Sequence, residues 1–145
     1  MKRCPLLVAV TIVLIIVGIH QSHSQENNIF DARILGKWQS DKERTLAWIK
    51  DYRSSEYEVF KKVEYGKLIL EFTKEEIVSS WAGTDELARH FPYRIVYMEG
   101  SIAILISPHP FEDRNEIRII KFEGKDSISI YSARYESKEY FRRIE

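Results

Sequence analysis

The feature that most constrains this fold is a change of hydrophobic period at Gly66. Beyond it, apolar residues occupy every second position in short runs, as in KLILEFT (67–73), SIAILIS (101–107) and EIRIIKF (116–122). Such alternation indicates half-buried β-strands, and turn residues such as Glu99-Gly100 separate the runs. Successive strands that share one apolar face and are joined by hairpins predict an antiparallel meander.

The residues before Gly66 have helical spacing instead. Apolar side chains fall three positions apart in two groups, Leu46, Ile49 and Tyr52, then Tyr57, Phe60 and Val63. A break is expected between the groups, near Ser54 and Ser55. Ser40 followed by Glu43 matches a capping box, which would start the helix. The strand ILGKWQS (34–40) comes before it.

These elements predict a mainly β domain over residues 34–145: an antiparallel up-and-down β-barrel of about eight strands, with a helical insert after the first strand. Closing eight strands into a barrel removes their exposed edges. The stretch AGTDELARHF (82–91) is expected to form a loop or a half-turn of helix.

The N-terminal segment has the three-part layout of a secretory signal peptide. Lys2 and Arg3 precede the uncharged run 5–19, and small Ser22 and Ser24 flank a cleavage point before Gln25. The run is shorter than the roughly 18 residues of a membrane-spanning helix. We therefore expect residues 1–24 to be a signal peptide, residues 25–33 a polar lead-in, and the protein to be periplasmic or extracellular. The alternative is an uncleaved N-terminal anchor, which would bring the chain into contact with a membrane.

Composition limits the classes of function. Removing residues 1–24 leaves 121 residues, with 20 basic and 22 acidic side chains and a net charge of −2. That charge gives no reason to expect a nucleic-acid partner. Cys4 is the only cysteine and lies in the segment removed, so the remainder can form no disulfide. For a small exported domain, this favours a bacterial envelope over an animal extracellular space.

No catalytic or metal-ligating pattern stands out. His90 and His109 are the only histidines after residue 24, and they lie 19 positions apart without further ligands at metal-site spacing. The Gly-x-Ser-x-Gly pattern is absent from the sequence. We therefore expect no enzyme activity, no metal and no cofactor.

A short motif gives a resemblance to a known family. GKW (36–38) on the first strand, with Arg142 or Arg143 on the last, resembles the signature of the lipocalin and calycin superfamily. The resemblance implies that Gly36, Trp38 and an arginine close the barrel, with the cation over the indole face. The helical insert is similar to that of fatty-acid-binding proteins. The whole resembles small secreted bacterial lipocalin-like domains of unknown function, although the disulfides of many secreted lipocalins are missing.

The expected function is binding of a small apolar or amphipathic molecule. Strand alternation favours Arg142 as the inward arginine, with Tyr140 on the same face, so that both could hold a ligand carboxylate. Trp81 and Tyr97 complete the predicted ligand site. In the alternative, one arginine stacks on Trp38 and the other is solvated.

A crowded interior would favour a different function. The side chains expected to point inward are large: Leu68, Leu70, Phe72, Tyr93, Tyr97, Ile102, Ile104 and Ile106. An eight-stranded barrel is only just wide enough for such side chains to fill. A solid-core barrel would then act as a protein-interaction module of the cell envelope without a ligand.

Overall fold

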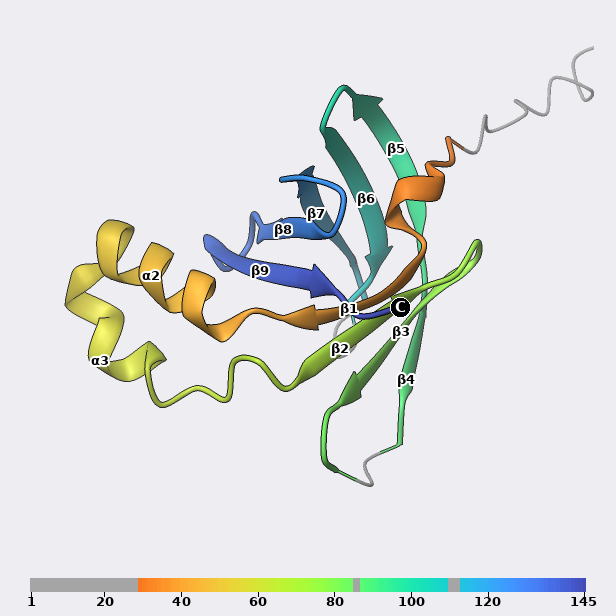
Figure 1. The fold of residues 1–145 in the computed structure, drawn as a ribbon. Helices are drawn as coiled ribbons and strands as arrows, with labels where there is room; N and C mark the ends of the chain where they lie inside the picture. The colour runs from red at the N-terminus through yellow and green to blue at the C-terminus, as the bar shows by residue number, and fades with distance from the viewer. Residues whose placement is uncertain (1–28, 85–86, 110–112) are drawn as a thin grey trace, which may run out of the picture.

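The computed structural model describes residues 29–84, 87–109 and 113–145, which form one curled antiparallel sheet (Figure 1). The hydrogen-bonded order of its nine strands is β4-β3-β2-β1-β9-β8-β7-β6-β5. The strands are β1 (Gly36–Ser40), β2 (Leu68–Phe72), β3 (Glu76–Trp81), β4 (Arg89–Pro92), β5 (Arg94–Glu99), β6 (Ile102–Pro108), β7 (Asn115–Phe122), β8 (Ser127–Ser132) and β9 (Ser137–Arg143). The predicted mainly β, antiparallel up-and-down barrel with an insert after the first strand is confirmed.

The expected signal peptide, residues 1–24, lies outside the described residues. Within the described part of the chain, no helix is long and apolar enough to cross a membrane.

The helical insert lies beyond the ends of β1 and β9 (Figure 1). It comprises α2 (Lys42–Tyr52), a 3-10 turn (Ser54–Glu56) and α3 (Tyr57–Phe60), so the break expected near Ser54 is present. The predicted capping box is wrong, because the Asp41 carboxylate accepts the Arg44 amide at 3.1 Å and caps α2. Ser40 belongs to β1 and is buried at its end. Thr45 anchors α2 to β9 by accepting the Tyr140 amide at 3.0 Å.

The ninth strand is β4, which occupies part of the stretch expected to be a loop. Its pairing with β3 runs from Glu76↔Pro92 to Ser79↔Arg89. Only Tyr93 separates β4 from β5, and these two strands stand at opposite ends of the hydrogen-bonded order. The barrel is therefore nearly closed, with its seam between two strands that are consecutive in the sequence.

Strand alternation sets which side chains fill the barrel. The buried core includes Leu70, Phe72, Ile77, Ile95, Ala103, Leu105, Ile120, Phe122, Ile128, Ile130 and Phe141. The expected inward face of β2 is confirmed, but that of β6 is wrong: Ala103, Leu105 and Ser107 are buried. Ile102, Ile104 and Ile106 lie on the opposite face, which leaves smaller side chains inside than the sequence led us to expect.

A β-bulge in β5 changes the alternation there. The pairing with β6 shifts between Ile95 and Tyr97, so that Tyr97 pairs with Ile104 and Met98 with Ala103. Ile95 is buried and Met98 packs against the core, whereas Tyr97 is exposed. A bulge puts one extra residue into a strand and reverses the faces beyond it. The expectation that Tyr97 points inward is therefore wrong.

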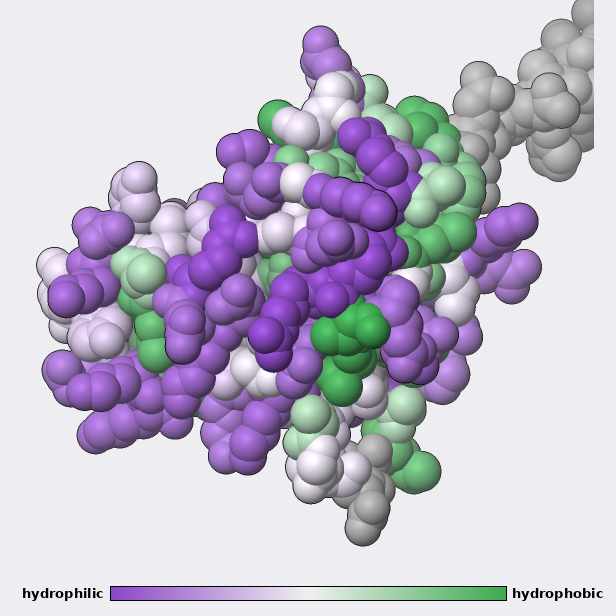
Figure 2. All heavy atoms as spheres, in the orientation of Figure 1, coloured by the Kyte–Doolittle hydropathy of each residue, from purple (hydrophilic) through white to green (hydrophobic). Residues whose placement is uncertain are grey.

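The outer face of the barrel is not uniformly polar. Figure 2 shows polar side chains over most of one face of the molecule, with apolar ones gathered on the side where β5 lies. Ile117 on β7 is 50% exposed, and Val96, Tyr97 and Ile102 are exposed as well. The large apolar residues of β5 to β7 are thus divided between the two faces of the sheet.

The two ends of the barrel domain meet where β1 pairs with β9. Trp38 is fully buried, and the Arg143 guanidinium carbon lies 4.1 Å from the centre of a Trp38 ring. Gly36 has φ +109°, and a Cβ atom there would lie 2.5 Å from the Glu145 carbonyl oxygen. The backbone can therefore pass so close only at a glycine.

Arg142 does not take the inward position that we assigned to it. Trp38 pairs with Arg143 and Gln39 with Arg142, and cross-strand partners point to the same face. Phe141, 2% exposed, fixes the odd-numbered residues of β9 as the inward row. Arg142 is exposed instead. Ile144, which suggested the other alternation, is itself 41% exposed.

Candidate ligand-binding cavity

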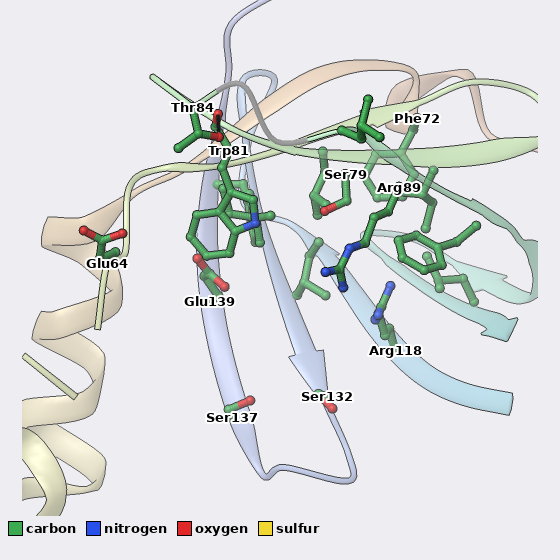
Figure 3. A pocket seen from close by; sticks show the side chains of 18 residues that line it. Glu64, Phe72, Ser79, Trp81, Thr84, Arg89, Arg118, Ser132, Ser137 and Glu139 are labelled. Carbon is green, nitrogen blue, oxygen red and sulfur yellow. Dashed lines mark hydrogen bonds between the residues drawn. The ribbon is translucent and has the colours of Figure 1, made fainter. Parts of the chain in front are cut away.

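A cavity of about 610 Å³ occupies one end of the barrel (Figure 3). Its walls come from β2, β3, β4 and β9 together with parts of β6, β7 and β8, and Glu64 before β2 and Thr84 and Leu87 after β3 also line it. The lining residues are Glu64, Leu68, Leu70, Phe72, Ile77, Ser79, Trp81, Thr84, Leu87, Arg89, Phe91, Leu105, Arg118, Ile130, Ser132, Ser137, Glu139 and Phe141.

Small inward side chains leave this end of the barrel hollow. Ser79, Ser132 and Ser137 all line the cavity, and Ser132 and Ser137 pair with each other across β8 and β9. The opposite wall is apolar, with Leu70, Phe72 and Ile77 from β2 and β3 among its residues. The result is an amphipathic space whose lining mixes apolar and polar side chains.

Two arginines reach into the cavity from opposite sides of the barrel seam. Figure 3 shows Arg89, from β4, and Arg118, from β7, directed toward the same region. Arg118 Nη2 lies 2.7 Å from Glu116 Oε2, and that carboxylate also accepts the Ser132 hydroxyl at 3.2 Å. Arg89 also has an electrostatic or hydrogen-bonding partner of its own. Arg118 is thus paired with a carboxylate, and Arg89 is not without a partner.

Glu139 on β9 places a carboxylate in the cavity wall. Its carboxylate oxygen Oε1 accepts a hydrogen bond from the Ser40 hydroxyl. Ser40 Oγ in turn accepts the Gly66 amide at 2.9 Å, so its single proton is available for Glu139. Burial raises the pKa of Glu139 above its ordinary value, and the Ser40 hydrogen bond opposes that rise.

Glu139 has no ion pair with any residue in the ranges 29–84, 87–109 and 113–145, and no hydrogen bond from them reaches its second oxygen. A buried carboxylate without a cation is costly to ionise. This end of the cavity therefore holds a carboxylate that has no counter-charge among the described residues.

The mouth of the cavity combines aromatic and charged groups. Trp81, 39% exposed, ends β3, and the Thr84 hydroxyl donates to its carbonyl at 3.1 Å. Glu64 is paired with Lys67 at 2.7 Å on the exposed side. Burial raises the pKa of the neighbouring Tyr65, and the negative charge of Glu139 raises it further. Tyr65 thus lies close enough to Glu139 for the carboxylate charge to raise the pKa of Tyr65.

Of the residues predicted to bind a ligand, the structure brings only Trp81 to the cavity. Tyr140 lies on the outer face of β9, with Arg44 at 4.4 Å and Lys138 at 4.6 Å from its ring. Arg142 is exposed, and the exposed Tyr97 donates a hydrogen bond to Glu99. These residues point away from the interior because the alternation of β9, and of β5 after its bulge, is opposite to the one predicted.

The sequence reasoning missed the charged residues of the cavity: Arg89, Arg118 and Glu139. A signal for two of them was present. Arg118 shares its alternation with the buried Ile120 and Phe122, and Glu139 shares its own with Phe141. A charged residue on the apolar row of a strand is a candidate for function. Arg89 gave no such signal, because the stretch around it was not expected to be a strand.

No three His, Cys, Asp or Glu side chains in the described ranges come together as a metal site would require. Comparisons with protein-family models, curated proteins and solved structures return no match to this chain. The nearly closed nine-stranded barrel is consistent with a calycin-like fold, and the cavity itself must indicate the function.

Proposed function

We propose that this protein is a binding module that takes one small amphipathic molecule into the barrel cavity. The observation that carries the proposal is the cavity of about 610 Å³ with a mixed apolar and charged lining. Small-molecule sites typically occupy about 300–1,000 Å³ and combine apolar walls with a few placed polar groups. No catalytic role is part of the proposal.

The apolar and the charged residues of the lining would contribute to binding in different ways. Leu68 and Phe91 of the lining are half-buried and offer apolar surface, and burial of apolar area contributes roughly 25 cal/mol per Å². The charged groups Arg118 and Glu139 cannot be matched by a purely apolar ligand, so they orient a molecule that carries polar groups. This favours an amphipathic ligand over a plain hydrocarbon.

The alternative function, a solid-core interaction module, loses its premise. It rested on eight large inward side chains, and the three of β2 do point inward. Tyr97 and the three isoleucines of β6 lie on the other face, Ala103, Leu105 and Ser107 take the inward places on β6, and a cavity lies beside Leu105.

Binding can be tested with a pair of substitutions on neighbouring residues of β3. Ser79→Phe fills the cavity, whereas Ser80→Phe adds the same ring to the opposite face of the strand. We expect the neutral fluorescent probe N-phenyl-1-naphthylamine to bind the full wild-type chain and the Ser80 variant. The Ser79 variant should lose that fluorescence gain. Equal probe binding by all three proteins would contradict the proposal, because the probe would then sit elsewhere.

We also propose that the protein is exported, periplasmic or extracellular, with residues 1–24 removed. The charge and hydropathy pattern of the N-terminal segment supports this. N-terminal sequencing of the exported protein should begin near Gln25, and finding Met1 or Lys2 would favour the uncleaved anchor.

Membership of the lipocalin-like group is part of the same proposal. Its support is the closure by Gly36, Trp38 and Arg143, which is the arrangement that the resemblance implies.

A further inference from the structure

Glu139 points to the chemistry of the ligand more sharply than any other residue of the cavity. The other lining charges already have protein partners: Glu64 has Lys67, Arg118 has Glu116, and Arg89 has an interaction of its own. Glu139 has only the Ser40 hydroxyl. The missing component at this end of the cavity is therefore a positive charge.

The register places an aromatic ring near the level of Glu139. Trp81 pairs with Leu68 on β2, and Leu68 lies one residue beyond the pair Gln39↔Ile69, level with Ser40 on β1. Ser40 pairs with Phe141 on β9, and Glu139 lies two positions from Phe141 on the same face of that strand. Ser40 binds Glu139 directly. Figure 3 shows the Trp81 indole and the Glu139 carboxylate extending toward each other within the cavity.

An indole face and a carboxylate both attract cations. The ring quadrupole favours an ammonium group over its face, and an ionised carboxylate gives a charge-assisted hydrogen bond to an N–H donor. A cation between the two would supply the counter-charge that Glu139 lacks. An apolar chain attached to it could then lie along Leu68 and Phe91, which are half-buried in the lining.

We propose that the cavity binds an organic cation, an amine with an apolar body, whose ammonium group lies between the Glu139 carboxylate and the Trp81 indole. This rests on the proposed function and names the class of its ligand. The two arginines lie toward the other end of the cavity and would face a polar group at the far end of such a molecule.

The test compares three probes that share a ten-carbon chain: decylamine, 1-decanol and decanoate. Each competes with N-phenyl-1-naphthylamine for the full chain at pH 7, at concentrations below those at which it forms micelles. We expect decylamine to bind at least about 10-fold more tightly than the other two, since a hydrogen bond to a charged group corresponds to roughly 10- to 100-fold in affinity.

Glu139→Gln keeps the size of the side chain and removes its charge. We expect this variant to lose the preference for decylamine over 1-decanol, and its circular dichroism spectrum shows separately that the barrel has folded. Trp81→Leu should reduce the amine-to-alcohol affinity ratio by about 3- to 30-fold. The matched control is Glu71→Gln, on the outer face of β2, which should change neither affinity.

Two failures can be told apart. If none of the three probes binds the wild-type chain, the binding function itself is wrong. If decanol or decanoate binds as tightly as decylamine, or Glu139→Gln leaves the preference for the amine intact, the cavity is a binding site but not for cations.

Discussion

Replacing Arg143 with methionine removes the charge that lies over Trp38 while keeping an unbranched, largely apolar side chain. The Arg143 guanidinium carbon lies 4.1 Å from the centre of a Trp38 ring, and Nη2 donates to the Arg33 carbonyl at 2.7 Å. Nη1 donates to the Leu35 carbonyl. The side chain is one quarter exposed, so these contacts are only partly shielded from water.

The expected loss in stability follows from these contacts. The cation–π contact is worth about 0.5–2 kcal/mol. The hydrogen bond to the part-buried Leu35 carbonyl adds about 1 kcal/mol, and the exposed one to the Arg33 carbonyl adds less. The ion pair of Arg143 with the exposed Asp126, at 3.6 Å, adds little. We therefore expect Arg143→Met to lower the free energy of unfolding by about 2–4 kcal/mol.

Urea denaturation followed by circular dichroism measures that change, and Arg142→Met is the matched control. Because Arg142 is exposed, its substitution should stay within about 0.5 kcal/mol of the wild type. A double-mutant cycle with Trp38→Leu should give a coupling energy of about 0.5–2 kcal/mol. If the two substitutions are additive, or if Arg142→Met costs as much as Arg143→Met, the assigned closure contact is wrong.

Three further outcomes are expected. Gly36→Ala should destabilise the barrel by about 1–3 kcal/mol in urea melts, because its Cβ would meet the Glu145 carbonyl at a positive φ; an unchanged midpoint would contradict the close approach. Asp41→Ala should cost about 1 kcal/mol by loss of the α2 cap, whereas Asp41→Asn should retain most of it. Burial raises the pKa of Glu139 in the folded state, so its ionised form opposes folding at neutral pH. Glu139→Gln should therefore stabilise the ligand-free protein at pH 7, with the advantage shrinking as pH falls through the folded-state pKa and vanishing below the ordinary value of 4.5; an advantage that persists at pH 3 would contradict this origin.

The sequence was most informative where one apolar row was unambiguous. On β2, Leu68, Leu70 and Phe72 form one apolar row, whereas the other row has Ile69 as its single apolar residue among Lys67, Glu71 and Thr73, and the inward face is as predicted. Trp81 follows from the alternation of β3 in the same way. The change of period at Gly66 was likewise enough to separate the helical insert from the barrel.

The sequence was least informative where both faces of a strand carry apolar residues. On β6, Ala103 and Leu105 lie inside although the isoleucines on either side are as large or larger, and alternation cannot choose between two apolar rows. Which row of β6 faces inward depends on its pairing with β5. That pairing shifts at the β-bulge between Ile95 and Tyr97, which no local sequence pattern indicates. The inward row predicted for β9 was wrong for a related reason, because Ile144 suggested the opposite row to Phe141.

During folding, the cavity can form only once β9 has paired with β1. Arg143 bonds the Leu35 carbonyl across 108 positions of the chain, and contacts that distant are slow to form because a long loop must close first. Ser137, Glu139 and Phe141 of the cavity wall lie on that same strand. On a ribosome, which releases the chain from its N-terminus, the strands β1 to β3 emerge long before their partner wall. The nascent barrel therefore has an unpaired β1 edge and a half-built cavity until β9 arrives, and that interval is when a chaperone would be most useful to it.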